Sequence, residues 1–188
     1  MKKVIVKSVV ITLCLLLVTI AISIAVITAY FPMTIADVAF RVNAKQPCVT
    51  YTEKAYEKNQ DIDTLAILTE RCIWANDNEK TVIYAEKFIV NENFDSYASS
   101  KDEGYAYYIA SEYVIALYQL GYKERSVESA FQLSNGFKAV GPLHRLIAIS
   151  AEANDIEILT AIKTKLTPYS TDEYAKYLIN VIDGVIGQ

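Results

Sequence analysis

The sequence predicts an all-α protein, and three observations support this fold class. The 188 residues include only four prolines and six glycines, so the tight turns that a β-sheet requires are scarce. Apolar residues recur at the three- and four-residue spacing of a helix face through most of the chain. A stretch of 23 residues near the N-terminus carries no charge. The chain therefore divides into one long apolar helix and a series of shorter amphipathic helices.

The apolar stretch, residues 9–31, is predicted to be a transmembrane helix. At the helical rise it is about 35 Å long, and the hydrocarbon core of a bilayer is about 30 Å thick. Two alternatives stay open: a secretory signal cleaved after Ala25 or Ala29, and lipid attachment at Cys14. The stretch is longer than the apolar region of a secretory signal, about 7 to 15 residues, and Cys14 lies inside it. We therefore expect an uncleaved signal anchor.

The cations that flank this helix predict its orientation. Three lysines and the amino terminus precede the helix, whereas two cations follow it; these are Lys2, Lys3 and Lys7 before it and Arg41 and Lys45 after it. Positive residues are retained on the cytoplasmic side. We expect a single-pass protein of the cell membrane with residues 1–8 as a cytoplasmic tail and residues 32–188 as an extracytoplasmic domain.

The charge balance restricts the classes of partner. The formal charge of the chain is −4, of which the three N-terminal lysines contribute +3, so the remainder carries −7. Nucleic-acid backbones and anionic lipid surfaces are bound by basic faces. The sequence therefore predicts no nucleic-acid partner, and it predicts contact with the lipid bilayer only through residues 9–31.

Short helices joined by tight turns are expected after the apolar helix. Pro32 suits the first turn of a helix, where its missing N–H is not needed. Residues 91–103 are polar and are expected to form an irregular connection. Thr171 begins a capping sequence for the last helix. The expected helices cover residues 32–43, 47–58, 63–75, 80–90, 104–120, 124–133, 141–153, 156–166 and 171–186.

Four of the turns align with one another. When Asn43, Asn76, Gly121 and Asn154 are superposed, each is followed by a similar helix start, and the spacings are 33, 45 and 33 residues. An irregular loop at residues 93–103 is expected to account for the longer middle spacing. The alignment predicts a repeated helix–turn–helix unit of about 34 residues.

This pattern resembles the tetratricopeptide repeat (TPR) over residues 30–163. The closest matches are Asn76-Asp-Asn-Glu-Lys80 and Tyr51-Thr-Glu-Lys-Ala55, in the turn and second helix. The first helices depart from the family: small residues stand at Ala36 and Thr69, but Val114 and Ile147 stand at the equivalent positions. The resemblance implies a TPR-like superhelix of about four helix pairs plus a C-terminal capping helix. An irregular helical bundle is the alternative.

The same resemblance bears on source and function. Membrane-anchored proteins of low-GC Gram-positive bacteria look similar, and the abundance of Ile, Lys, Asn and Tyr fits an AT-rich genome. Stacked helix pairs bury their apolar stripes against their neighbours and leave a curved surface for peptides or proteins. The resemblance thus implies a protein or peptide partner.

Two cysteines are candidates for a disulfide. Cys48 and Cys72 are equidistant from Gln60, which lies in the turn between two expected helices. In an antiparallel helix pair such residues come level, and an extracytoplasmic compartment permits oxidation. A Cys48–Cys72 bridge would stabilise the fold by about 3.5 kcal/mol in the chain-entropy model. The alternative is that both thiols act as small apolar residues of the core.

The sequence shows no catalytic or metal-binding motif. His144 is the one histidine, and the dispersed cysteines match no ligand spacing. Gly-rich phosphate loops, Gly-x-Ser-x-Gly and His-Glu-x-x-His are absent from the sequence. We therefore expect neither an enzyme nor a resident cofactor or metal.

A tyrosine-rich segment is the candidate interaction surface. Tyrosine is favoured at protein interfaces because it offers a large contact area at little cost in side-chain entropy. Tyr107 and Tyr118 are eleven residues apart and fall on one helix face, so they are predicted to form an exposed pair. Tyr105, Tyr108 and Tyr113 share another face and are expected to pack in the core, and Tyr122 follows at the end of the segment.

These observations predict a membrane-anchored scaffold or adaptor that binds another protein. One alternative is an accessory subunit whose apolar helix packs inside a larger membrane complex; the helix lacks the Gly-x-x-x-Gly packing motif. A hydrolase on a helical scaffold is the other. Replacing residues 9–31 by an unrelated apolar helix separates the first two, because only the accessory subunit should then lose its partner.

Overall fold

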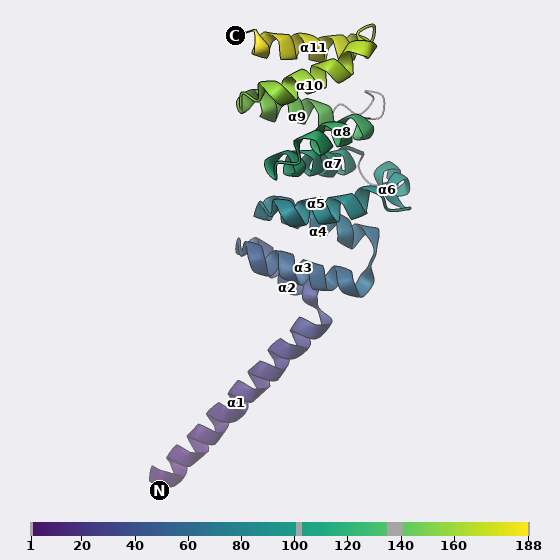
Figure 1. Ribbon diagram of the computed structural model, residues 1–188. Coiled ribbons are helices and arrows are strands. Elements are labelled where there is room, and N and C mark those ends of the chain that lie inside the picture. Colours follow the sequence, from purple (N-terminus) through teal and green to yellow (C-terminus); the bar gives the residue numbers. More distant parts are fainter. Residues whose placement is uncertain (1, 101–102, 135–140, 188) are drawn as a thin grey trace. The chain divides into compact units, whose positions relative to one another are not determined.

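The computed structural model describes residues 2–100, 103–134 and 141–187, and within these ranges it consists of helices and turns without strands (Figure 1). The predicted all-α fold class is confirmed. The helices are α1 Lys2–Tyr30, α2 Pro32–Arg41, α3 Lys45–Asn59, α4 Ile62–Ala75, α5 Asn78–Ile89, α6 Phe94–Ser100, α7 Glu103–Gln119, α8 Lys123–Leu133, α9 Gly141–Glu152, α10 Ile156–Leu166 and α11 Glu173–Ile186, with a 3₁₀ turn at Thr167–Tyr169.

Two compact units make up the chain. The first is Met1–Gln60 and contains α1 and the helix pair α2–α3; the second is Asp61–Gln188 and contains the other helices. The sequence predicted one domain over residues 32–188, whereas α2 and α3 group with α1. The division follows the turn at Gln60, where α3 ends in a left-handed residue.

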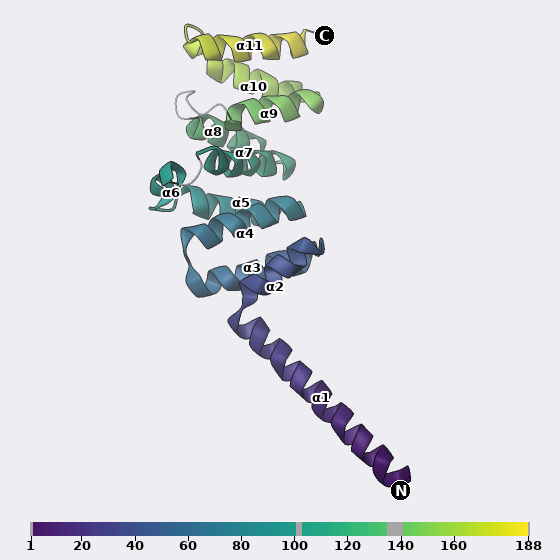
Figure 2. The ribbon, with the colours of Figure 1, turned by 180° about the vertical axis from the view of Figure 1, so that it is seen from behind.

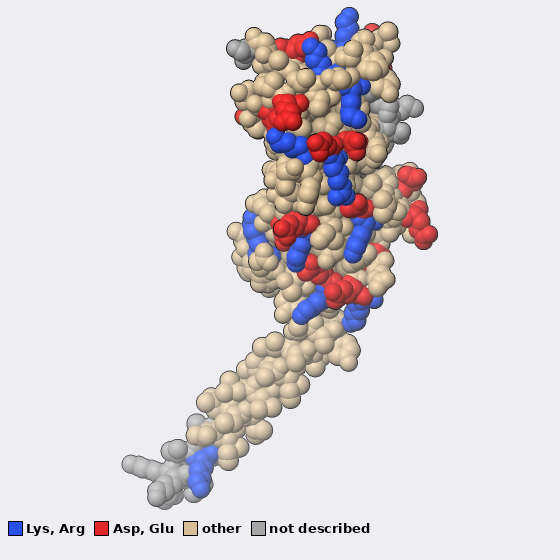
Figure 3. Space-filling view, in the orientation of Figure 1, with Lys and Arg blue, Asp and Glu red and all other residues tan. Residues whose placement is uncertain are grey.

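The helix α1 is long and apolar enough, over Val10–Tyr30, to cross a membrane. The apolar side chains within Val10–Tyr30 are exposed, and Figure 3 shows no Lys, Arg, Asp or Glu on the visible surface of this stretch. The hydroxyls of Thr19 and Thr28 donate to the carbonyls of Leu15 and Ile24, at 2.9 and 2.6 Å. These bonds within the helix satisfy the two hydroxyls without water.

The four aligned turns have the same backbone structure. Asn43, Asn76, Gly121 and Asn154 all have positive φ, between 51° and 84°. In each turn the N–H of the following residue donates to the carbonyl five positions before it, at 2.8 to 3.0 Å. This six-to-one bond defines the Schellman motif, which ends a helix with a left-handed residue, usually Gly and sometimes Asn. The turn residues of the sequence alignment are therefore equivalent in structure.

Burial follows the same register as the turns. Ala36, Thr69, Val114 and Ile147, which the alignment places at one position of the first helix, are all at most 2% exposed. Residues as different in size as alanine and isoleucine are therefore accommodated at this one buried position. The helix pairs are α2–α3, α4–α5, α7–α8 and α9–α10, and α11 follows them.

Within the second unit, helices pack against their neighbours in chain order, as the two opposite views show (Figures 1 and 2). One apolar core runs through this stack; its fully buried members include Leu65, Leu68, Phe88, Ile109, Leu117, Leu143, Leu146, Leu159, Ile162, Leu178 and Ile182. Acidic and basic side chains are intermingled on the face seen in Figure 3. The core fixes the helices, and the polar residues remain available at the surface.

One expected feature differs from the structure. The connection at residues 91–103 contains the short helix α6, whose Phe94 and Tyr97 each meet Phe88 edge-on with ring centres 5.3 Å apart. These aromatic contacts hold α6 against α5, so the middle of the chain is not an irregular loop. The last helix has its cap within the predicted sequence that Thr171 begins: Asp172 accepts from the N–H groups of Tyr174 and Ala175. Residues 135–140, between the expected helices 124–133 and 141–153, lie outside the described residues.

Candidate functional site

A groove between α8 and α10 is the candidate site of the second unit. It encloses a hollow of about 290 Å³. The two helices are the second members of successive pairs, so each follows one of the Schellman turns. The floor is apolar: Val127 and Ile158 are buried, and Ala161 is half-buried. The alanine leaves room between the helices, which is why the surface is hollow there.

The rim of the groove is mainly acidic. Glu124 and Glu128 stand one turn apart on α8, and Glu157 lies in the first turn of α10; all three are exposed. Lys165 closes the groove, with its Nζ 6.0 Å from the ring centre of Phe131. Lys123 also lines it, but its ammonium is engaged by Asp155. The groove therefore offers an apolar floor surrounded by an excess of carboxylates.

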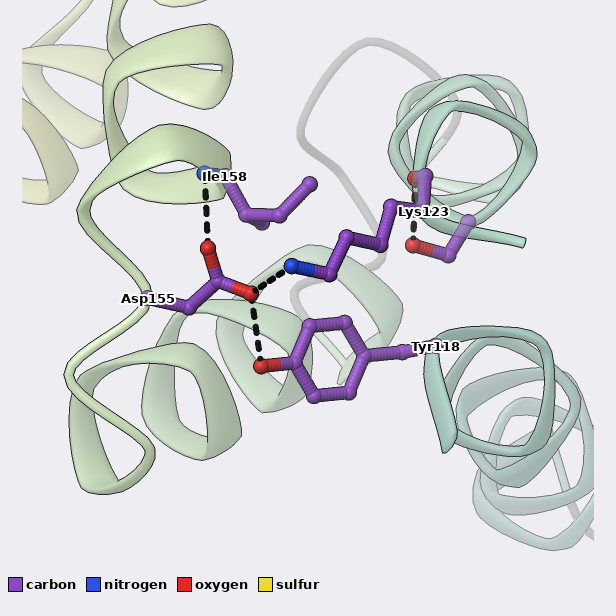
Figure 4. Close-up of polar contacts among 5 residues, drawn as sticks. Tyr118, Lys123, Asp155 and Ile158 are labelled. Carbon is purple, nitrogen blue, oxygen red and sulfur yellow. Dashed lines mark hydrogen bonds and ion pairs between the residues drawn. The ribbon is translucent and has the colours of Figure 1, made fainter. Parts of the chain in front are cut away.

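Asp155 connects the two helix pairs beside the groove (Figure 4). Its Oδ2 accepts from the Tyr118 hydroxyl at 3.0 Å and lies 2.7 Å from Nζ of Lys123. Its Oδ1 accepts from the backbone N–H of Ile158 at 3.3 Å, which caps α10. The Asp155 side chain is only 11% exposed, whereas that of Lys123 is 42% exposed. One carboxylate thus joins α7, α8 and α10.

The charges of this junction are coupled. The hydrogen bond from Lys123 is the largest influence that lowers the pKa of the Asp155 carboxyl below its ordinary value. The same bond raises the pKa of the Lys123 ammonium. Burial and the hydrogen bond to Asp155 raise the pKa of the Tyr118 phenol. At neutral pH the junction is therefore an ion pair with a neutral phenol as additional donor, and this arrangement orients the turn before α10.

A second polar surface crosses the first helices α4, α7 and α9. The Tyr105 hydroxyl donates to Oε2 of Glu70 at 2.9 Å, and Nη2 of Arg145 lies 2.8 Å from Oε1 of Glu112. Tyr108 on α7 is 43% exposed and lies within the electrostatic influence of Glu112, Glu70 and Arg145. Burial is the largest cause of the raised pKa of both the Tyr105 and the Tyr108 phenol.

The expected exposed tyrosine pair is not present. Tyr107 and Tyr118 are both half-buried, and the hydroxyl of Tyr118 is used by Asp155. The exposed tyrosines of this segment are Tyr108 and Tyr122. The signal for Tyr108 was available in the sequence, because Glu112 lies one turn further along the same face, and a carboxylate indicates a wet face.

The cysteines occupy core positions of the repeat. Cys14 is exposed on α1, whereas Cys48 and Cys72 are both fully buried. When the four turns are aligned, Cys48 occupies the same position as Thr81, Ser126 and Leu159. Cys72 occupies the same position as Ala39, Leu117 and Ser150. All of these equivalent residues are buried. Burial at these positions is thus a property of the repeat and requires no oxidation. The Cys48–Cys72 disulfide stays a prediction.

Histidine and acidic residues form no evident chemical centre in the described part of the chain. His144 is exposed near the start of α9. Among the described residues there is no group of three or more His, Cys, Asp or Glu side chains arranged to hold a metal ion.

Comparisons with protein-family models, with curated proteins and with solved structures find no match to this chain. The groove and its surroundings are therefore interpreted from their own chemistry.

Proposed function

We propose that this chain is a membrane-anchored protein-binding module without catalytic activity. In this proposal α1 lies in the bilayer, the helix pairs form a TPR-like superhelix on the extracytoplasmic side, and a segment of a partner protein occupies the groove between α8 and α10. The observation that carries the proposal is the groove itself, with its apolar floor of Val127, Ile158 and Ala161 and its acidic rim.

The chemistry of the groove selects a class of partner. A hollow of about 290 Å³ accommodates one or two aliphatic side chains rather than a folded domain. The carboxylates of Glu124, Glu128 and Glu157 favour lysine or arginine on either side of that anchor. The expected ligand is a cationic segment with a Leu, Ile or Met at its centre. This choice agrees with the net charge of −7 beyond the N-terminal lysines.

The repeated turns support the superhelix. Four Schellman turns with the same hydrogen bonds impose the same reversal on four helix pairs, and equivalent residues then become buried. Polar contacts across roughly one repeat, such as Glu112 with Arg145, connect consecutive pairs.

Peptide selection on the full-length chain tests the proposal. The protein in lipid nanodiscs is panned against a library of short random peptides, and enriched peptides are titrated by fluorescence anisotropy. Reversing two rim charges, with Glu124→Lys and Glu128→Lys together, should weaken binding at least about tenfold, equivalent to about 1.4 kcal/mol. Glu152→Lys, combined with Glu173→Lys, makes the same change in net charge outside the groove and should leave binding unaltered.

A steric variant supplies an independent test. Ala161→Trp fills the hollow and should abolish binding, whereas Thr160→Trp places the same ring on the exposed face of α10. Trp74 is the native tryptophan of the chain, so far-UV circular dichroism rather than indole fluorescence should verify that both variants fold. Enriched peptides without cations, or equal binding to the two tryptophan variants, would refute the groove as the binding site.

A further inference from the structure

A second hollow lies in the first compact unit, at the end of α1. It measures about 600 Å³ and is bounded by α1, the start of α2 and the last turns of α3. The residues of α1 that line it are small: Ala25, Thr28 and Ala29. The α3 side is charged and consists of Lys54, Glu57 and Lys58, all of which are exposed.

Lys58 fixes the position of this charged side against α1. Its Nζ donates to the carbonyls of Ala29 and Tyr30 at 3.3 and 3.4 Å, and it lies 5.4 Å from the ring centre of Tyr30. The last carbonyls of a helix have no partner within the helix and carry its negative dipole end, so an ammonium is favoured there. A positive charge is therefore built into the end of the apolar helix.

Lys54 extends the positive side by one turn. It precedes Lys58 by four residues, so both lie on one face of α3. Its Nζ is 4.9 Å from the ring centre of Tyr51, on the same helix. Together with Glu57, the two lysines give this side of the hollow a net charge of +1. That charge matches a single phosphodiester and is too small for a polyanion.

The depth of the hollow matches the boundary between lipid headgroups and acyl chains. With Val10–Tyr30 in the bilayer, Tyr30 lies at the membrane surface. Ala25 lies five residues before it, which is about 7 Å deeper along the helix. The small side chains of Ala25 and Ala29, one turn apart, open the lower part of the hollow. The Lys58 ammonium lies at its upper part, beside the carbonyls of Ala29 and Tyr30, where such a group remains hydrated.

We propose that this hollow binds the headgroup of a singly anionic phospholipid with hydroxyl groups, such as phosphatidylglycerol. Lys54 and Lys58 contact the phosphate, Glu57 accepts from a headgroup hydroxyl, and the glycerol and upper acyl carbons lie against Ala25 and Ala29. The site selects a lipid by its phosphate and hydroxyls and holds α3 at the membrane surface. This inference rests on the bilayer placement of α1 in the proposed function but not on the groove between α8 and α10.

Native mass spectrometry of the full-length chain in detergent, titrated with phosphatidylglycerol, tests the site. The double variant Lys54→Gln/Lys58→Gln should raise the apparent Kd at least about tenfold, whereas Lys87→Gln/Lys176→Gln makes the same charge change in the second unit and should not. Ala25→Leu fills the hollow without altering charge and should also weaken binding; Ala21→Leu, one turn earlier, should not. Phosphatidylcholine should bind weakly to every variant.

Retention of phosphatidylglycerol by Lys54→Gln/Lys58→Gln would overturn the lipid site, and so would an equal loss of phosphatidylglycerol affinity in the two double variants. Displacement of the lipid by millimolar inorganic phosphate would also overturn it, because this result would indicate a general anion site. Resistance of each variant to alkaline extraction from membranes tests the anchor separately. Peptide binding at the groove should be unaltered in the lipid-site variants, so failure of the lipid site and failure of the proposed function give different results.

Discussion

Nη2 of Arg145 on α9 and Oε1 of Glu112 on α7 form an ion pair at 2.8 Å. The two residues are 33 positions apart in the sequence, which equals the first and third of the three spacings between the aligned turns. The two residues lie on first helices of consecutive pairs, so the contact joins equivalent faces of the repeat. The Arg145 side chain is 56% exposed and that of Glu112 is 17% exposed. The contact therefore lies at the rim of the core rather than within it.

Because the pair is exposed to water, its energetic contribution should be small. We expect Arg145→Gln to lower the free energy of unfolding by less than about 1 kcal/mol, the usual range for surface ion pairs. Urea unfolding of the full-length protein in mild detergent, followed by Trp74 fluorescence, measures the change. A loss above about 2 kcal/mol would show that Arg145 supports the core directly.

Asp155→Ala should cost more, although Asp155 is also part of an ion pair. The alanine variant loses the cap of α10, the partner of Lys123 and the acceptor of the half-buried Tyr118 hydroxyl. Loss of a helix cap alone costs about 1 kcal/mol, and an unsatisfied hydroxyl adds to this cost. We expect a total of about 1 to 3 kcal/mol in the same urea experiment. Asp155→Asn retains an acceptor for the Ile158 N–H and should fall between wild type and Asp155→Ala.

The stability contributed by Asp155 should depend on pH in one direction. Its pKa is lower in the folded protein than the value of about 3.9 expected for the unfolded chain. A carboxyl of this kind stabilises the fold fully above its unfolded pKa, and the contribution disappears as the pH falls through the folded pKa. Wild type should thus exceed Asp155→Asn in unfolding free energy at pH 7, and the gap should narrow below about pH 4. A gap that widens on acidification would contradict the ion pair with Lys123.

The sequence predicted the turns well because each depends on local chemistry. Asn and Gly tolerate a positive φ, so Asn43, Asn76, Gly121 and Asn154 mark helix ends by residue type alone. The apolar helix was equally predictable, because length and composition alone define it. Burial of Ala36, Thr69, Val114 and Ile147 at one position then followed from the alignment of the turns.

The features that the sequence did not predict depend on contacts between side chains of different helices. The helix α6 has only seven residues, too few to be stable alone, and it is held by the edge-on contacts of Phe94 and Tyr97 with Phe88 of α5. The groove likewise has no sequence signature, because Val127 and Ala161 meet only when α8 and α10 are side by side. Helical periodicity defines the faces of a helix but not which neighbour covers each face. For this reason periodicity alone predicts Tyr118 at the surface, whereas its hydroxyl bonds to Asp155 of the next helix pair.

The equivalence of the turns predicts the effect of substituting Gly121. Its φ is +84°, and a Cβ placed there would meet no atom within 4 Å, so the cost of a side chain is conformational rather than steric. Gly121→Ala should destabilise the second unit by about 1 kcal/mol, because alanine is strained in the left-handed region. Gly121→Asn should cost less, since asparagine occupies the three equivalent turns. Equal costs for the two variants in urea unfolding would argue against this equivalence.

Whether Cys48 and Cys72 are oxidised tests the predicted extracytoplasmic location of the domain. If Cys48 and Cys72 are bridged in the extracytoplasmic space, protein isolated in the presence of a blocking reagent and then denatured should take up maleimide at these two positions only after reduction. Cys14 has no predicted disulfide partner and is the internal control. In the denatured protein its thiol should be modified whether or not reductant is added. Intact mass spectrometry counts the adducts.

A Cys72→Ala variant separates a bridge from two buried thiols. A bridged wild type should lose about 3.5 kcal/mol of unfolding free energy on this substitution, by the loop-closure argument for about 25 residues, and addition of dithiothreitol to wild type should reproduce most of the loss. Thiols that pack only as core residues would give a smaller loss on substitution and no response to reductant. In that case maleimide would modify all three cysteines of the unreduced, denatured protein. An oxidised cysteine pair would then no longer support the predicted extracytoplasmic location.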